Sequence, residues 1–312
     1  MDENVFTSKI TAKNLIDSKI EKELTEGLNL IELPAPQFVP KNWGVGGDLS
    51  GFENGIGFKI NGKDYISMHT LSRWGRVVLS ELKLKEEGIF TSISSFDKDI
   101  INNDLAFSRN EKWCYAIPIL ESQAKYVLLK QYAKKTYRLI CKSYKSVLRR
   151  VDSLKSVELT EEPSFISLSQ IIKDLGDLDL EQKLYEIVKS KKAVFVFGIG
   201  NYFLDGERLL RPRSVDAENW NLNGEMLVYD NEKDEIVQFF ALGIGVDEKA
   251  LLKQANKSDQ RALFYEFCSA VRGKRIPLAI SCEIVKSQVY SLILDEKSFT
   301  PTEFSAFSGK DG

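Results

Sequence analysis

A run of β-strand patterns between residues 192 and 246 limits the possible folds more than any other feature of this chain. The first pattern, "KAVFVFGIG" (192–200), is apolar on both faces, which places it inside a sheet, covered on each side. Two more strand patterns follow it, "GEMLVYD" (224–230) and "EIVQFFALGIGV" (235–246). The centre of the protein is therefore predicted to be a β-sheet.

Further strands and helices surround this centre. The segment "GIGFKINGKDYISM" (55–68) predicts a hairpin that turns at Asn61-Gly62, the strongest short hairpin signal. Strands are also expected at "GIFTSISSF" (88–96), "EKWCYAIPIL" (111–120) and the start of "AISCEIVKSQVYSLIL" (279–294), which ends as a helix. Other helices are expected at 8–27, 70–88, 121–150, 177–190 and 247–271, and "VDSLKSVELTEEPSFISLSQ" (151–170) reads as a polar connection. These patterns predict a single α+β domain over residues 1–312, with a mostly antiparallel sheet flanked by helices.

Composition narrows the function classes. The net charge of -2 gives no overall preference for nucleic acid or acidic membranes. No apolar run reaches the roughly 20 residues that span a bilayer, and the acidic start "MDENVFTSKITAKN" is not a signal peptide. The four separated cysteines read as buried free thiols, and a single histidine, His69, argues against a histidine-based metal site or catalytic relay. A cytoplasmic protein fits these features.

Two segments allow a partner as well as a purely structural role. The helix at 8–27 and the strand in "LNLIELPAP" (28–36) form either a dimer edge or a surface helix and strand. The helix at 121–150 carries nine Lys or Arg against one acid, Glu121. Such a stripe binds RNA, or it is a solvated face whose charge is balanced by acids elsewhere.

Several polar constellations are candidates for chemistry. The glycine-rich "FGIGNYFLDG" (197–206) lacks the spacing of a phosphate loop, so its glycines read as turn formers. The segment "DAENWNLNGEMLVYD" (216–230) gathers acids that hold Mg²⁺ in some proteins but also collect in ordinary polar loops. His69 precedes a helix whose first turns contain Arg73 and Arg76; these arginines face either a carboxylate ligand or solvent.

Taken together, these segments resemble asparagine synthetase A, the ammonia-dependent aspartate ligase family built on a class II aminoacyl-tRNA-synthetase core. The family's "DNLSG" and "HSLAKWKR" correspond to "GDLSG" (47–51) and "HTLSRWGR" (69–76). Its "GIGGKLSDG" corresponds to "GIGNYFLDG" (198–206), and its "RAPDYDDW" and "LNGDILVW" to "RSVDAENW" (213–220) and "LNGEMLVY" (222–229). The motifs are short, but they keep one order along nearly the whole chain.

The resemblance implies an antiparallel sheet flanked by helices, a homodimer, and an aspartyl-adenylate formed with ATP and Mg²⁺ and then attacked by ammonia. Such chemistry needs cations at the transferring phosphate and acids that hold the metal. Glu225 is the candidate metal ligand. The residues that match family motifs and would line the remaining ligand pocket are Asp48, Ser50, His69, Arg76, Asp205, Arg213, Asp216 and Glu225.

Many of the family's site positions are changed in this sequence. Asp97 stands where the motif 2 arginine grips the α-phosphate, and Gln288 replaces the motif 3 arginine in "SCEIVKSQ" (281–288). Cys282 and Glu283 replace glycines and are expected to crowd the adenine space, and Lys286 is expected on a different side of the helix. The substituted positions are Gly47, Gly75, Asp97, Lys112, Cys114, Gln238 and Gln288.

These substitutions lead to three hypotheses. The first is a binding or regulatory paralogue that has lost ligase activity, because each missing positive clamp removes roughly 10² to 10³ in rate. The second is an active amide-forming ligase with a rebuilt site, in which Arg76, Lys98, Arg109, Arg208 or Arg213 supplies the replacement cations. The third is an RNA- or tRNA-binding protein that uses the basic 121–150 helix.

Overall fold

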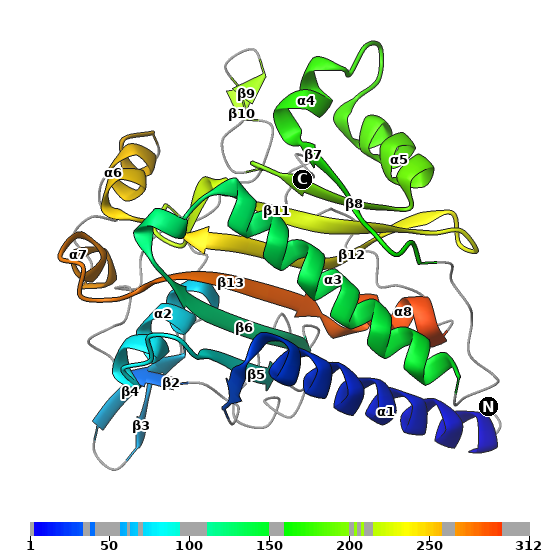
Figure 1. The fold of residues 1–312 in the computed structure, drawn as a ribbon, viewed down its shortest axis with the longest axis horizontal. Helices are drawn as coiled ribbons and strands as arrows, with labels where there is room; N and C mark the ends of the chain where they lie inside the picture. Colours follow the sequence, from blue (N-terminus) through cyan, green and yellow to red (C-terminus); the bar gives the residue numbers. More distant parts are fainter. Residues whose placement is uncertain are drawn as a thin grey trace.

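One eight-stranded sheet organises the protein (Figure 1). The computed structural model describes residues 3–33, 38–40, 57–60, 63–67, 71–93, 111–149, 159–199, 203–204, 207–208, 215–257 and 266–294. In spatial order, the strands of the sheet are β1 (Leu30–Glu32), β5 (Gly88–Ile93), β6 (Lys112–Ile119), β13 (Leu278–Val285), β12 (Glu235–Gly245), β11 (Glu218–Asp230), β8 (Ala193–Phe197) and β7 (Ser164–Ser167).

The sheet is antiparallel inside and parallel at its two edges. The pairs from β5 across to β8 are all antiparallel, whereas β1 pairs parallel with β5 and β7 pairs parallel with β8. The predicted α+β class with a mostly antiparallel sheet is therefore confirmed. The apolar strand at 192–200 is β8, and it is paired on both sides as expected.

Part of the segment interpreted as a polar connection forms a strand and the start of a helix. Its last residues form β7 and the short helix α4 (Leu168–Lys173). The strand "SFIS" is half-buried on both faces. Its sequence has neither an apolar run nor a clean alternation, so it carries no clear strand signal. Pairing with β8 therefore creates this strand, because residues 164–167 align with residues 194–197 of a strand that is already buried.

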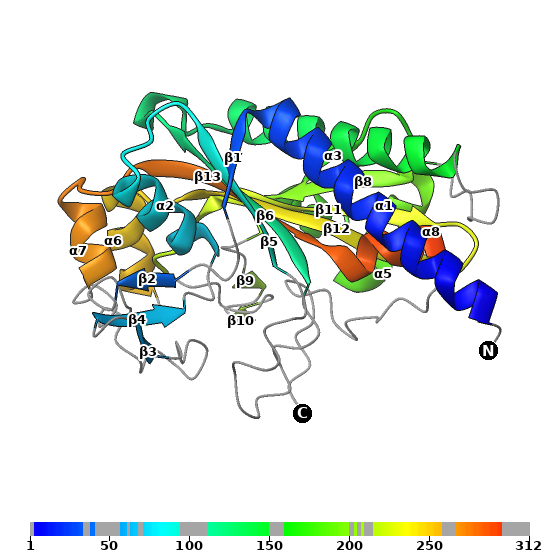
Figure 2. The same ribbon diagram turned by 90° about the horizontal axis from the view of Figure 1, so that it is seen from below.

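The longest helices cover one face of the sheet, called here the α1/α3 face. Helices α1 (Glu3–Leu28) and α3 (Tyr126–Leu148) cross it side by side, and α8 (Lys286–Leu294) lies at its end (Figures 1 and 2). Ile16, Ile20 and Leu24, spaced one turn apart on α1, are buried against α3 and the sheet. Burying each such side chain contributes about 1.5–3 kcal/mol, so this layer is the main core.

Shorter elements lie on the opposite side, called here the α2 face (Figure 2). Helices α2 (Leu71–Glu81), α6 (Glu248–Lys257) and α7 (Glu266–Arg272) form one apolar cluster at one end of it, with Trp74 and Phe267 in its centre. Helices α4 and α5 (Leu180–Lys191) form another cluster over β8 and β11. The middle of the α2 face lies between these two clusters.

Two small sheets complete the described structure. Strands β3 (Gly57–Ile60) and β4 (Lys63–Ser67) pair antiparallel, as the Asn61-Gly62 signal predicts, and β2 (Phe38–Pro40) adds to β4. Strands β9 (Phe203–Leu204) and β10 (Glu207–Arg208) form a second, two-stranded sheet. A 3-10 turn at Glu121–Gln123 precedes α3, so the helix expected from residue 121 begins at Tyr126.

A bulge in β12 decides which side chains reach the α2 face. Met226 pairs with Phe240 but Leu227 pairs with Gln238, so Phe239 is an extra residue in the ladder. As a result, Phe239 and Phe240 both enter the core of the α1/α3 face. Gln238 is turned onto the α2 face, beside Leu227.

A buried ion pair joins α2 to the start of β11. The guanidinium of Arg73 donates to the carboxylate of Asp216, and the two side chains are 2% and 0% exposed. The thiol of Cys268 on α7 also lies 3.5 Å from this carboxylate. Three elements that are far apart in sequence therefore meet at Asp216.

We expect Asp216→Asn to lower the free energy of unfolding by about 3–5 kcal/mol, because it leaves the Arg73 charge buried without its counter-ion. Urea denaturation of the full chain measures the change. The control is Glu162→Gln, which breaks an exposed contact with Lys134 and Arg138 and should cost less than about 1 kcal/mol. Equal losses in the two variants would contradict a stabilising role for the buried pair.

Candidate functional site

Small and polar side chains occupy the middle of the α2 face. Strand alternation and register place them in two adjacent rows that cross β11, β12, β13 and β6. We call this surface the polar floor. Its first row is Glu225, Ala241, Glu283 and Cys114, and its second row is Asn223, Gly243, Ser281 and Ala116. At the β6 end, Cys114 and Ala116 also belong to the apolar cluster around α2.

The second row contains two buried groups with unused hydrogen-bonding capacity. Asn223 is 0% exposed, and its Oδ1 accepts from the backbone N–H of Ile199 at 3.2 Å. Its Nδ2 has no hydrogen-bond partner among the described residues, and the same holds for Oγ of Ser281. Buried polar groups are usually satisfied, so these atoms mark a place where a polar ligand or water would be stabilised.

Carboxylates give the polar floor a negative character. Glu225 is fully buried, in the first row. Glu218 belongs to the same face, and its carboxylate lies where a β-carbon on Gly243 would be. Glu283 completes this set, two strands away from Glu225.

Lys112 neutralises one of these carboxylates. Its Nζ donates to Oε2 of Glu283 at 2.7 Å, and both side chains are about one-quarter to one-third exposed. The charge of Glu283 raises the pKa of Lys112 above its ordinary value. Next to this pair, burial raises the pKa of the Cys114 thiol well above its usual range, and Glu283 adds to the effect. Cys114 is therefore held as a neutral thiol.

Helix α2 touches the edge of the polar floor without a side chain between them. A β-carbon on Gly75 would overlap the β-carbon of Ala116 on β6. The helix backbone therefore packs directly on the strand at this point. A longer residue at position 75 would need α2 to move away from the sheet.

Arg76, the next residue of α2, is buried and makes hydrogen bonds within the protein. Its Nε donates to the carbonyl of Pro277 at 2.8 Å and its Nη1 to the carbonyl of Val246 at 2.9 Å. The guanidinium also lies over the ring of Phe267, 5.5 Å from its centre. Burial lowers the pKa of Arg76 to about 10, which leaves it charged at neutral pH. These contacts fix α2 to β12 and to the chain before β13.

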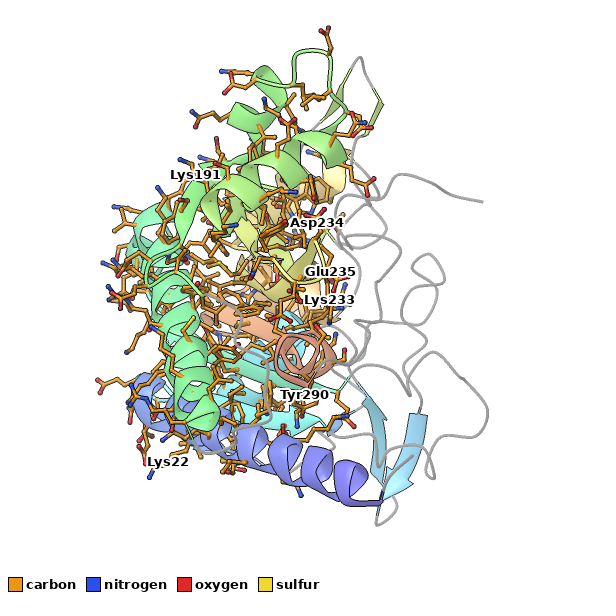
Figure 3. The ribbon with its side chains drawn as sticks, turned by 90° about the vertical axis from the view of Figure 1, so that its right-hand side faces the viewer. Lys22, Lys191, Lys233, Asp234, Glu235 and Tyr290 are labelled. Atoms are coloured by element: carbon orange, nitrogen blue, oxygen red, sulfur yellow. The ribbon has the colours of Figure 1, made fainter. Side chains whose placement is uncertain are left out.

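Lys286, the first residue of α8, lies on the α1/α3 face of the sheet. Lys286 is buried and donates to Oγ of Ser92 at 2.8 Å, and its Nζ lies 3.6 Å from Asp17 on α1. It also lies over the indole of Trp113, at 4.9 Å. Tyr290, shown beside α1 in Figure 3, donates to the same Asp17. Lys286 therefore belongs to the α1/α3 face, as its position on the helix predicted.

The comparisons with known proteins agree with this architecture. A family model described as aspartate-ammonia ligase matches residues 8–310. The chain belongs to the aspartate–ammonia ligase family. It is 26% identical to the aspartate–ammonia ligase of Malacoplasma penetrans, over 92% of this chain and 89% of that protein. It is 28% identical to that of Clostridium perfringens strain SM101, over 79% and 74%.

Solved structures show the same fold at much lower identity. Asparaginyl-tRNA synthetase from Pyrococcus horikoshii, complexed with asparaginyl-adenylate, is similar with a TM-score of 0.60 and 12% identity, covering 98% of this chain and 69% of that one. The asparaginyl-tRNA synthetase of Entamoeba histolytica, also with asparaginyl-adenylate, has a TM-score of 0.57 and 10% identity, covering 98% and 68%. The class II aminoacyl-tRNA-synthetase-like core is therefore the fold of this family member.

The structure locates several of the positions identified as substituted. Gly75, aligned above with a lysine of the family, contacts Ala116, which leaves no room for a longer side chain. Cys114 and Lys112 lie on the α2 face, with Lys112 held by Glu283. Gln238 reaches this face through the β12 bulge, and Gln288 is 5% exposed on α8.

One expectation about crowding needs correction. Of the two residues that replace motif 3 glycines, Glu283 lies on the polar floor, but Cys282 packs in the core of the α1/α3 face. Neighbouring residues of a strand point to opposite faces, so the two cannot both fill one pocket. Only Glu283 takes space on the α2 face.

The residues predicted to line a pocket are not all brought together. Glu225 lies on the polar floor, whereas Arg76 and Asp216 make the structural contacts described above. The remaining predicted positions lie outside the described residues: Gly47, Asp48, Ser50, His69, Asp97, Asp205 and Arg213. Lys98 and Arg109 do so too, and of Arg208 only the backbone is described.

Asn223 and Ser281 are not among the pocket residues that the sequence motifs point to. Both lie two residues from a predicted or substituted site position, Asn223 before Glu225 and Ser281 before Glu283. Period-two alternation along a strand would have found them, since it places such residues on one face.

The basic stripe of α3 is partly neutralised within the chain. Lys134 and Arg138 pair with Glu162, and Lys142 pairs with Glu23 of α1 at 2.7 Å. Lys145 lies 3.8 Å from Glu161. These contacts favour the interpretation as a balanced, solvated face over binding of RNA.

We predict that the four buried cysteines, Cys114, Cys141, Cys268 and Cys282, are unreactive in the folded protein. Burial raises the pKa of each thiol, so the reactive thiolate is scarce even at pH 9. The measurement is DTNB labelling at pH 9, with and without urea. Labelling should occur only after unfolding. Fast labelling without urea would contradict the burial of these thiols.

Proposed function

We propose that this member of the aspartate–ammonia ligase family lacks ordinary ATP-dependent ligase activity and serves as a binding or regulatory protein. The charge of the polar floor carries the proposal. Glu225 and Glu283 belong to it and the Glu218 carboxylate lies over it, while Lys112 is already paired with Glu283. Transfer of an adenylyl group from ATP requires cations around the phosphates in addition to the acids that hold the metal.

At two family positions, the described residues supply no cation to the polar floor. The position of the family's lysine is Gly75, packed against β6, and the nearest cation of motif 3, Lys286, is bound on the other face of the sheet. A polyphosphate placed on the polar floor would lie beside Glu283 without a cation from either of these two positions, and like charges in a partly buried site repel. The lack of these cations supports the proposal that the polar floor holds a ligand other than ATP, or no ligand.

Among the described residues, no three His, Cys, Asp or Glu side chains lie close enough together to hold a metal ion. Glu225 is the candidate of the floor for a carboxylate ligand, and the other positions around a divalent cation would be filled by water or substrate.

The second candidate function is an active amide-forming ligase with a rebuilt site. It is supported by Glu225, which keeps an acid at the family's position on the floor, and by similarity over most of the chain to proteins named aspartate–ammonia ligase. Its replacement cations would come from Lys98, Arg109, Arg208 or Arg213, whose side chains lie outside the described residues. In that case ATP and Mg²⁺ would be its cofactors.

We also propose a homodimer built on α1 and β1. Strand β1 is an edge strand with one paired side, and Ile31 on it is 38% exposed. Edge strands offer unpaired backbone groups to another chain. Separately, none of the described helices has the length and apolar character needed to cross a membrane.

The proposed function is tested by aspartate-dependent exchange of pyrophosphate into ATP, with Mg²⁺ present. The aspartate–ammonia ligase of Malacoplasma penetrans serves as the positive control. Loss of two cationic clamps predicts exchange at least about 10⁴-fold slower than the control. Faster exchange would overturn the proposal and support the active ligase.

A further inference from the structure

A cavity of about 180 Å³ lies between α6 and the first residues of β11, at the outer end of the α2 face. Figures 1 and 2 show α6 beside α7 at this end of the molecule. None of the residues singled out as candidate site positions lines it. Its polar and charged lining includes Lys249, Lys253, Lys257, Asn219, Asn221 and Asp247.

The three lysines share one side of α6. They are spaced four residues apart, which is slightly more than one helical turn and about 6 Å along the axis. Like charges at this spacing destabilise a helix. The arrangement therefore becomes favourable when an anion is present between the lysines.

The lysines of α6 differ from those of α3 in this respect. On α3, Lys134 and Lys142 are each paired with a glutamate 2.7 Å away. Lys249 and Lys253 are exposed, and neither has a carboxylate within 4 Å in the described part of the chain. Their charge is available to a ligand.

Other groups around the cavity suit an anion. The Oδ1 of Asn219 accepts from the backbone N–H of Asn221 at 3.0 Å, which leaves its amide N–H groups as donors. Asp247, the acid among the lining residues, caps α6 by accepting from the N–H of Ala250 at 2.7 Å. Lys249 and Lys253 against one aspartate leave this part of the cavity with an excess of positive charge.

The wall of the cavity is rigid. Gln254 of α6 donates to the carbonyls of Val215 and Glu218 and accepts from the N–H of Trp220, all within 3.1 Å. One buried side chain thus holds the helix against the strand. A preorganised wall lowers the ordering cost of binding.

We propose that this cavity binds a small oligophosphate through Lys249, Lys253 and Lys257. Successive phosphate groups provide the repeated negative charge that matches lysines one turn apart, and lysine binds phosphate as a point charge. The volume is below the 300–1,000 Å³ of typical organic-ligand pockets, which favours a phosphate chain over a whole nucleotide or a nucleic-acid strand. The site is separate from the polar floor, so the inference stands apart from the proposed function.

The test is calorimetric titration of the full chain with sodium tripolyphosphate at low salt. We expect binding that weakens as salt is raised from 50 to 200 mM. The double variant Lys249→Gln/Lys253→Gln should weaken it at least about tenfold, while glutamine keeps a helix propensity close to that of lysine. Absence of tripolyphosphate binding to the natural chain would overturn the proposal.

The matched control removes the same charge elsewhere. Lys183→Gln/Lys191→Gln changes two lysines of α5, on which Figure 3 shows Lys191 at the surface, and should leave the affinity unchanged. Equal weakening in both double variants would show non-specific charge attraction and would overturn the site. A 12-residue oligouridine that binds more tightly than tripolyphosphate, with the same dependence on Lys249 and Lys253, would overturn the small-ligand assignment in favour of RNA.

Discussion

Burial of the α1/α3 face against the sheet is the interaction on which the rest of the structure depends. Residues such as Leu24 and Tyr137 are completely buried there, in one continuous core with the strands. Because this face is filled by two long helices, each strand is fixed in register and its alternate residues must lie on the α2 face. The polar floor is therefore a consequence of the core: its members are the residues that alternate with the buried apolar ones.

Two buried cations contribute to packing, one on each side of the sheet. Helix α2 contacts β6 directly because Gly75 and Ala116 are small, and Arg76 is held by two carbonyls on the same side. Lys286 contributes to the opposite core through Ser92, Asp17 and Trp113. Arg76 and Lys286 therefore hold elements of the fold together.

Charge is distributed differently over the surfaces of the molecule. On α3, Lys134, Lys142 and Lys145 lie close to glutamates from α1 and from the chain before β7, so the positive charge of that helix is partly neutralised. On α6, Lys249 and Lys253 face a cavity, and neither has a carboxylate within 4 Å in the described part of the chain. Exposed ion pairs of the first kind contribute little to stability, whereas uncompensated charge of the second kind is available for recognition. The contrast could not be seen from the number of lysines in each helix, since the partners come from distant segments.

The sequence by itself determined the α+β class, the hairpin at Asn61-Gly62, the long helices and the family, because these follow from local periodicity, turn chemistry and collinear motifs. It also singled out Glu225, which lies on the polar floor, and it put Lys286 on a separate side of its helix. Only the tertiary structure decided that Gln238 faces the α2 side, since a bulge at Phe239 shifts the alternation, and that Cys282 lies in the opposite core. It also decided the partners of Arg76 and Asp216, which are set by contacts between segments more than a hundred residues apart. Local patterns carry no information about such contacts, because they arise only when the sheet has brought the segments together.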